Sequence, residues 1–166
     1  MANIFNPEEI LRIAITVETN GKALYGTLEA NAREEKIKET WRYLKEQEGV
    51  HQKIFQEMLD KGGDFIVAEF NPGEYDAYMR AIASEYVFTQ NMVSKKVKEG
   101  FVSDMEAVDF GIYVEKESIL TYSALRAYIL PVKQAVIDKV IDEERKHLVD
   151  LTNIKRSLQK KDNDGY

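Results

Sequence analysis

The feature that most constrains the fold of this chain is the near absence of residues that break helices. Only three prolines occur in 166 residues, Pro7, Pro72 and Pro131. The tracts between them are rich in Ala, Leu, Glu and Lys, which have the highest helix propensities. No segment has a convincing strand pattern, so the sequence predicts an all-α protein.

Apolar residues recur at three- and four-residue spacing in four segments of the chain, which indicates four amphipathic helices. We expect helices from Pro7 to the low thirties, over 37–61, over 104–129 and from Pro131 to 159. Two helical hairpins, 7–61 and 104–159, are thus joined by roughly forty residues, whose own amphipathic part is 74–98. This pattern predicts an antiparallel four-helix bundle with a long helical crossover between its second and third helices.

The expected domain organisation is one bundle over residues 1–159, followed by a polar C-terminal tail, 160–166, that we expect to be disordered. Gly49 stands inside the second predicted helix and indicates a local distortion or a close contact between helices.

Each of the four apolar stripes contains a glutamate near its middle. Burying a carboxylate costs several kcal/mol unless it is paired, and four that converge would also repel one another. No lysine or arginine lies on these stripes at the same level. Two divalent cations would balance four carboxylates. The glutamates are Glu18, Glu48, Glu115 and Glu144.

Both histidines of the chain stand three residues after one of these glutamates, in Glu48-x-x-His51 and Glu144-x-x-His147. A spacing of three places both side chains on one helical face. Neutral imidazole and carboxylate together suit iron, manganese, cobalt or zinc. The predicted metal ligands are Glu18, Glu48, His51, Glu115, Glu144 and His147.

The two halves of the chain also repeat each other. Glu18 precedes Glu48 by 30 residues, and Glu115 precedes Glu144 by 29. A tyrosine follows the first glutamate of each half by seven residues, at Tyr25 and Tyr122. These spacings indicate an internal duplication of one metal-binding hairpin. Tyr25 and Tyr122 are candidate catalytic residues that would hydrogen-bond a ligand carboxylate or a metal-bound oxygen; core packing is the alternative.

One glutamate from each of two helices and Glu-x-x-His from each of the other two is the template of di-iron and di-manganese carboxylate proteins. On these motifs the chain resembles the ferritin-like superfamily, most closely the rubrerythrin-like proteins, over residues 8–158. The resemblance implies a ferritin-like bundle in which Glu48 and Glu144 bridge two metal ions. Glu18 and Glu115 would be terminal ligands, and each histidine would bind one ion.

The chain departs from the rubrerythrin pattern in two ways. Rubrerythrins usually carry a further carboxylate one turn after the terminal glutamate of the third bundle helix, where this chain has Ser118. They also carry a cysteine-bearing rubredoxin domain, whereas this chain has no cysteine. Electrons would therefore have to come from a separate donor protein.

The function expected from this resemblance is reduction of hydrogen peroxide by a di-iron oxidoreductase. A ferroxidase or iron-handling protein that reacts with dioxygen is the main alternative. A non-catalytic metal-binding bundle and a manganese catalase are the others, so iron is the expected metal, with manganese or zinc left open.

Charge and hydropathy restrict the partners. The net charge of −6 and the pI near 5.1 argue against a nucleic-acid or anionic-membrane surface. No secretory signal or membrane span is recognisable, so we expect a cytoplasmic protein, which we take to be a homodimer. We interpret Glu46, Glu117 and Glu143 as surface residues.

Overall fold

The computed structural model describes residues 7–61, 77–78, 81, 91–127 and 129–164. Every regular element in these ranges is helical, as the sequence predicts. The elements are α1 (Pro7–Asn31), α2 (Glu35–Asp60), α4 (Asp104–Arg126), the 3-10 turn η1 (Pro131–Lys133) and α5 (Gln134–Asp164). Residues 91–99 are also helical. The rest of the crossover predicted over 74–98 lies mostly outside the described residues.

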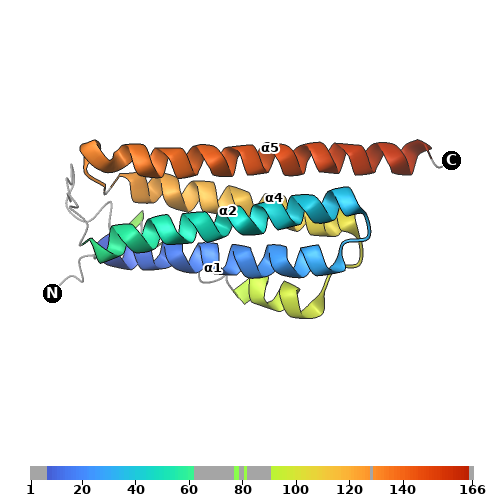
Figure 1. The fold of residues 1–166 in the computed structure, drawn as a ribbon, viewed down its shortest axis with the longest axis horizontal. Coiled ribbons are helices and arrows are strands. Elements are labelled where there is room, and N and C mark those ends of the chain that lie inside the picture. The colour runs from blue at the N-terminus through green and yellow to red at the C-terminus, as the bar shows by residue number, and fades with distance from the viewer. Residues whose placement is uncertain (1–6, 62–76, 79–80, 82–90, 128, 165–166) are drawn as a thin grey trace.

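The helices form an antiparallel bundle (Figure 1). α1 packs most extensively on α2, and α4 on α5, so the two predicted hairpins are present; α1 also contacts α4. α2 ends at one end of the bundle, while α4 begins at the other (Figure 1). The connection between them therefore has to run the length of the bundle.

Local signals in the sequence account for the beginning of α4. The sequence Ser103-x-x-Glu106 has the pattern of a capping box, and the amide of Glu106 donates to the Ser103 hydroxyl at 3.2 Å, as this motif requires. In a capping box the glutamate would accept from the amide of Ser103. Here the Glu106 carboxylate accepts instead from the amide of the preceding residue, Val102, at 2.7 Å. Just before this cap, Gly100 has a φ of 78°, which glycine adopts without strain and which ends the helix of residues 91–99.

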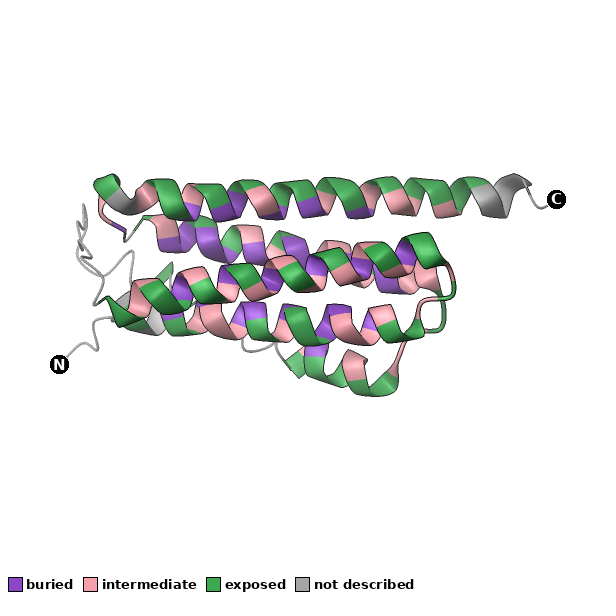
Figure 2. Ribbon diagram, viewed as in Figure 1, coloured by how far each residue is buried: buried purple, intermediate pink, exposed green. Residues whose placement is uncertain are grey.

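Buried residues line the inner faces of the helices (Figure 2). They form two apolar clusters, one around Leu11, Phe55 and Ile137 and the other around Leu24, Trp41 and Leu151. The buried polar and charged residues are Glu18, Glu48, His51, Glu115, Ser118, Thr121, Glu144 and His147.

α5 is longer than predicted. It continues to Asp164, so residues 160–164 are helical and the expectation of a disordered tail is wrong there. Lys160 and Lys161 are good helix formers that can extend an existing helix. Among the described residues, no helix is long and apolar enough to cross a membrane.

Candidate metal centre

The structure brings the six predicted ligand residues together in the middle of the bundle. α1 carries Glu18, α2 carries Glu48 and His51, α4 carries Glu115, and α5 carries Glu144 and His147. Each is buried, with at most 3% of its surface exposed. Because the glutamates occupy positions of the apolar stripes, the same periodicity that buries leucine elsewhere turns these carboxylates inward.

Ligand-type atoms form two overlapping groups, within each of which they lie within 4.8 Å of one another. The first group consists of Glu18, Glu48, His51 and Glu144, and the second of Glu48, Glu115, Glu144 and His147. Glu48 and Glu144 belong to both groups. Two groups of four residues that share two carboxylates are suited to binding two neighbouring cations.

Both imidazoles turn Nδ1 toward the carboxylates. His51 Nδ1 lies 2.7 Å from Glu144 Oε1 and 3.7 Å from Glu18 Oε2. His147 Nδ1 lies 3.2 Å from Glu144 Oε2 and 3.6 Å from Glu115 Oε2. The two rings stack with centroids 5.8 Å apart. Each histidine therefore presents the same ring nitrogen to its own group of carboxylates.

Within the described part of the chain, several of these atoms are buried without a hydrogen bond: Glu18 Oε2, Glu115 Oε2, Glu144 Oε1 and His51 Nδ1. The contact between the last two is short, but it lacks hydrogen-bonding geometry. Buried polar atoms normally have a partner, so a cluster of unpartnered acceptors calls for one. Carboxylate oxygens and imidazole nitrogens are suitable donors for iron, manganese or zinc. The residues present therefore fit a pair of such ions.

Two tyrosines link the halves of the cluster. Tyr25 of α1 donates its hydroxyl to Glu115 Oε1 of α4, and Tyr122 of α4 donates to Glu18 Oε1 of α1. Both tyrosines are fully buried. Each hydroxyl occupies one oxygen of its glutamate and leaves Oε2, the unpartnered oxygen, facing the cluster. The tyrosines thus orient these carboxylates, as outer groups commonly do around metal ligands.

The protein groups by themselves strongly perturb each other's ionisation. Burial, followed by the charge of Glu144, raises the pKa of Glu115 to about 8. Burial also raises the pKa of Glu18 and of Glu48 well above 4.5. Burial opposes protonation of the imidazoles, but the short contact with Glu144, the charge of Glu144 and Glu48, and the hydrogen bond with Glu143 prevail and raise the pKa of His51 to about 9.

Glu144 behaves differently from the other three carboxyls. Burial opposes its ionisation, but the hydrogen bond with His147 and the short contact with the His51 imidazole outweigh this and lower its pKa. The pKa of His147 is raised to about 10, again against burial, by the nearby carboxylates of Glu115 and Glu144. No lysine or arginine is buried in the part of the chain that the structure describes. Within the cluster, protons or metal ions therefore have to neutralise the carboxylates.

Two residues contribute to this centre without having been predicted to do so. Glu143, interpreted as a surface residue, has its side chain only 22% exposed and lies 2.8 Å from His51 Nε2. Gly21 lies against Glu48: a Cβ at this position would be 3.0 Å from the Glu48 carboxyl carbon and Oε1. Gly49, in contrast, sits in continuous helix and has only ordinary contacts with Lys22, so neither role expected for it is found.

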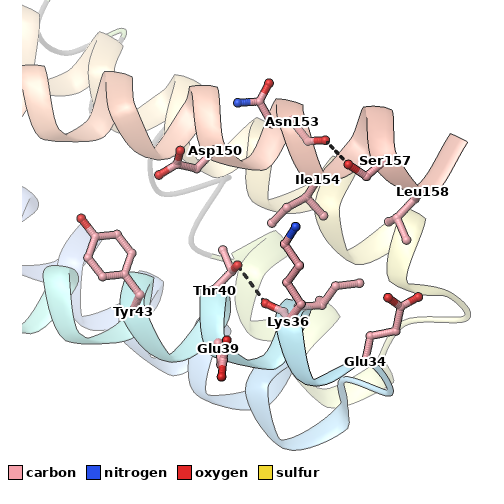
Figure 3. A pocket seen from close by; sticks show the side chains of 11 residues that line it. Glu34, Lys36, Glu39, Thr40, Tyr43, Asp150, Asn153, Ile154, Ser157 and Leu158 are labelled. Carbon is pink, nitrogen blue, oxygen red and sulfur yellow. Dashed lines mark hydrogen bonds between the residues drawn. The ribbon is translucent and has the colours of Figure 1, made fainter. Parts of the chain in front are cut away.

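A cavity lies outside the cluster. It has a volume of about 510 Å³ between α2 and α5, and Figure 3 shows Tyr43 and Asp150 among the side chains that line it. None of the six candidate ligands is part of its wall. One lining residue does meet the cluster, since the ring of Tyr43 contacts His147 edge-on at 6.0 Å between centroids.

Comparison with known proteins agrees with this geometry. The model of the rubrerythrin family matches residues 9–155. A crystal structure from Thermotoga maritima, described as a candidate ferritin-like diiron-carboxylate protein, has a TM-score of 0.67 and 26% sequence identity. The match covers 94% of this chain and 98% of that one. No curated protein sequence matches the chain.

Proposed function

Because this chain belongs to the rubrerythrin family, we propose that its buried cluster binds two iron ions and reduces hydrogen peroxide. The observation that carries this proposal is the pair of overlapping ligand groups that share Glu48 and Glu144. Two shared carboxylates hold neighbouring ions close together, which is what a two-electron reaction on one small molecule requires.

The remaining ligands complete the two positions in the same way. Glu18 and Glu115 would each bind one ion through Oε2, because the tyrosine hydroxyls already occupy Oε1. His51 and His147 would each add one nitrogen through Nδ1. Four carboxylates against two divalent cations leave the centre electrically neutral, which makes its burial tolerable.

A bound iron pair would supply the two electrons that reduce one hydrogen peroxide to two water molecules. The side chains exclude bulk water, since all six candidate ligands are buried. The reaction also consumes two protons. Tyr25 and Tyr122 are poor sources for them, because burial and the charge of nearby carboxylates raise the pKa of both hydroxyls well above 10. The protons are therefore expected to come from outside the cluster.

Electrons must return to the centre after each cycle. The chain has no cysteine that could hold an iron–sulfur or rubredoxin-type centre. We therefore include a separate electron-donor protein in the proposal. We also propose that the functional assembly is a homodimer.

An anaerobic titration tests the proposed reaction. The protein is loaded with two Fe(II) per chain and mixed with hydrogen peroxide, and the absorption of diferric iron is followed by stopped flow. We expect complete oxidation at one peroxide per chain, faster than for the same iron free in buffer. Glu48→Ala, which lacks a shared ligand, should react no faster than free iron.

The same experiment with dissolved dioxygen distinguishes the ferroxidase. Faster oxidation by dioxygen than by peroxide, with Fe(III) released from the protein, would identify a ferroxidase and refute the peroxidase proposal. Oxidation of the loaded wild type at the rate of free iron would refute both.

A further inference from the structure

The repeat between the two halves of the chain is broken beside the metal cluster. The residue before each Glu-x-x-His motif is Glu143 in the second half and Gln47 in the first. These two positions are equivalent in the duplicated hairpin, yet one carries a carboxylate and the other a neutral amide.

Glu143 contacts the histidine of the opposite half. Its Oε2 lies 2.8 Å from Nε2 of His51, in hydrogen-bonding geometry, and bridges α5 to α2. His51 is fully buried, whereas the Glu143 side chain is 22% exposed. The other ring nitrogen of His51, Nδ1, is the atom that faces Glu18, Glu48 and Glu144.

The equivalent nitrogen of the second histidine has no such partner. Nε2 of His147 is buried and makes no hydrogen bond in the described part of the chain. In the described part of the chain, Gln47 therefore makes no hydrogen bond to His147 that would match the one between Glu143 and His51. The ring of Tyr43 contacts the ring of His147 edge-on, and such a contact does not hold a proton on Nε2 of His147.

This difference matters for a metal ligand. A neutral imidazole carries one N–H, and the hydrogen bond made by one nitrogen decides which nitrogen keeps a free lone pair. A carboxylate at Nε2 holds the proton there, leaves Nδ1 free to bind an ion, and makes the imidazole a stronger base. Loss of such a partner usually lowers metal affinity 10–100-fold.

We propose that Glu143 is a positioning residue for His51 and makes the two metal positions unequal. The position formed by Glu18, Glu48, His51 and Glu144 binds its ion first and more tightly than the position that contains His147. This inference rests on the proposed dinuclear centre and adds an order of filling to it.

A cobalt titration tests the order. Metal-free protein is titrated with Co(II) against a competing chelator, and the visible absorption of bound Co(II) gives two stepwise constants. For the wild type we expect two separated steps. In Glu143→Gln the tighter step should weaken by about 10–100-fold, with the weaker step little changed, so that the two steps converge. Glu46→Gln, which removes an exposed charge from α2, should keep the wild-type ratio.

The ratio of the two stepwise binding constants distinguishes a specific effect of Glu143 on His51 from a general loss of negative charge near both ions. If Glu143→Gln weakened both steps equally, or neither, the inference would be overturned, although two bound ions would still support the proposed centre. If the wild type bound no more than one ion, the centre itself would fail.

A measurement on the wild type alone gives a second test. The chain has only two histidines, so a nitrogen-15 spectrum of the Zn(II)-loaded, histidine-labelled protein shows just two imidazoles. We expect a slowly exchanging Nε2 proton on His51 and a faster one on His147. Equal exchange, or His51 bound through Nε2, would contradict the role of Glu143.

Discussion

At the scale of single residues, the metal centre depends on the room left for the shared carboxylates as well as on the ligands themselves. Gly21 follows Glu18 by three residues on α1 and faces Glu48 of α2. Any Cβ there would meet the carboxyl group at 3.0 Å. The side chain could move aside, but Glu48 belongs to both ligand groups, so its displacement would disturb both metal positions.

Gly21→Ala should therefore weaken metal binding without unfolding the protein. Overpacking of this kind costs about 1–3 kcal/mol, or about 5–150-fold in affinity, when the carboxylate is held by metal. The metal-free variant should be no less stable than wild type, because alanine favours a helix by about 0.5–1 kcal/mol over glycine. Metal titration and chemical denaturation measure the two effects.

Gly26→Ala provides the matched control on the same helix. A Cβ at Gly26 would meet only the Lys45 side chain, at an ordinary 3.5 Å. It should gain the helix stability and keep full metal affinity. Equal metal affinity in the two alanine variants would show that Glu48 does not need the space that Gly21 provides.

The sequence predicted the six inward-facing candidate ligands because periodicity alone turns a residue toward the core. Glu143 and Gly21 depend on a different quantity, namely the distance and rotation between helices. Position 143 is adjacent to Glu144 and reads as a flank of the stripe, and only the approach of α5 to α2 brings it to His51. The glutamic acid–glutamine mismatch with position 47 was visible in the sequence, but its meaning was not.

At the scale of elements, the tyrosine hydrogen bonds join α1 to α4 in both directions. These helices belong to different hairpins, so the two bonds connect the halves of the duplicated chain. The spacing of seven residues predicted that each tyrosine shares a face with its own glutamate. The structure shows that each one instead donates to the glutamate of the other half, which no pattern within one helix could specify.

Tyr122→Phe should destabilise the protein by about 1–3 kcal/mol, because it leaves Glu18 Oε1 buried without a donor. Tyr25→Phe should do the same through Glu115. Chemical denaturation of the metal-loaded variants measures the loss. Tyr43→Phe is the control, since the Tyr43 side chain is nearly half exposed. A wild-type midpoint for both buried variants would mean that the bonds contribute nothing to stability.

At the scale of the whole molecule, the buried charges make stability depend on pH when metal is removed. Glu18, Glu48 and Glu115 have a folded-state pKa above their ordinary 4.5, so their contribution to stability is fully present below that value and is lost as pH rises through the folded-state pKa, which is about 8 for Glu115. The histidine contributions persist to higher pH, since their pKa values are about 9 and 10. The pKa of Glu144 is lowered, so its contribution to stability is fully present above pH 4.5 and is lost only as the pH falls below that value.

The metal-free protein should consequently melt at lower temperature at pH 8 than at pH 5.5, by about 2–4 °C for each kcal/mol lost. The metal-loaded protein should show the opposite trend, because protons compete with metal for the same atoms. The gap between the two forms should therefore widen with pH. Below pH 5 the surface pairs of Glu29 and Asp138 also lose stability, since their pKa values are lowered by Lys45 and Arg126.

Thermal melts with and without chelator at several pH values measure this gap. Metal-free Glu115→Gln is the comparison, because it lacks the group that titrates near pH 8. Its melting temperature should vary less between pH 6 and 8 than that of the metal-free wild type. A gap that stays constant with pH would show that the buried carboxylates do not take up protons when metal leaves.

The number of ions bound per chain tests the central claim most directly. Metal-free protein is titrated anaerobically with Fe(II), and bound iron is counted after removal of the excess. We predict two ions for wild type and for Glu117→Ala, and fewer than one for Glu48→Ala, which loses a ligand that both groups share. Two ions retained by Glu48→Ala, or no stable binding by the wild type, would contradict the assignment of this cluster as a dinuclear metal centre.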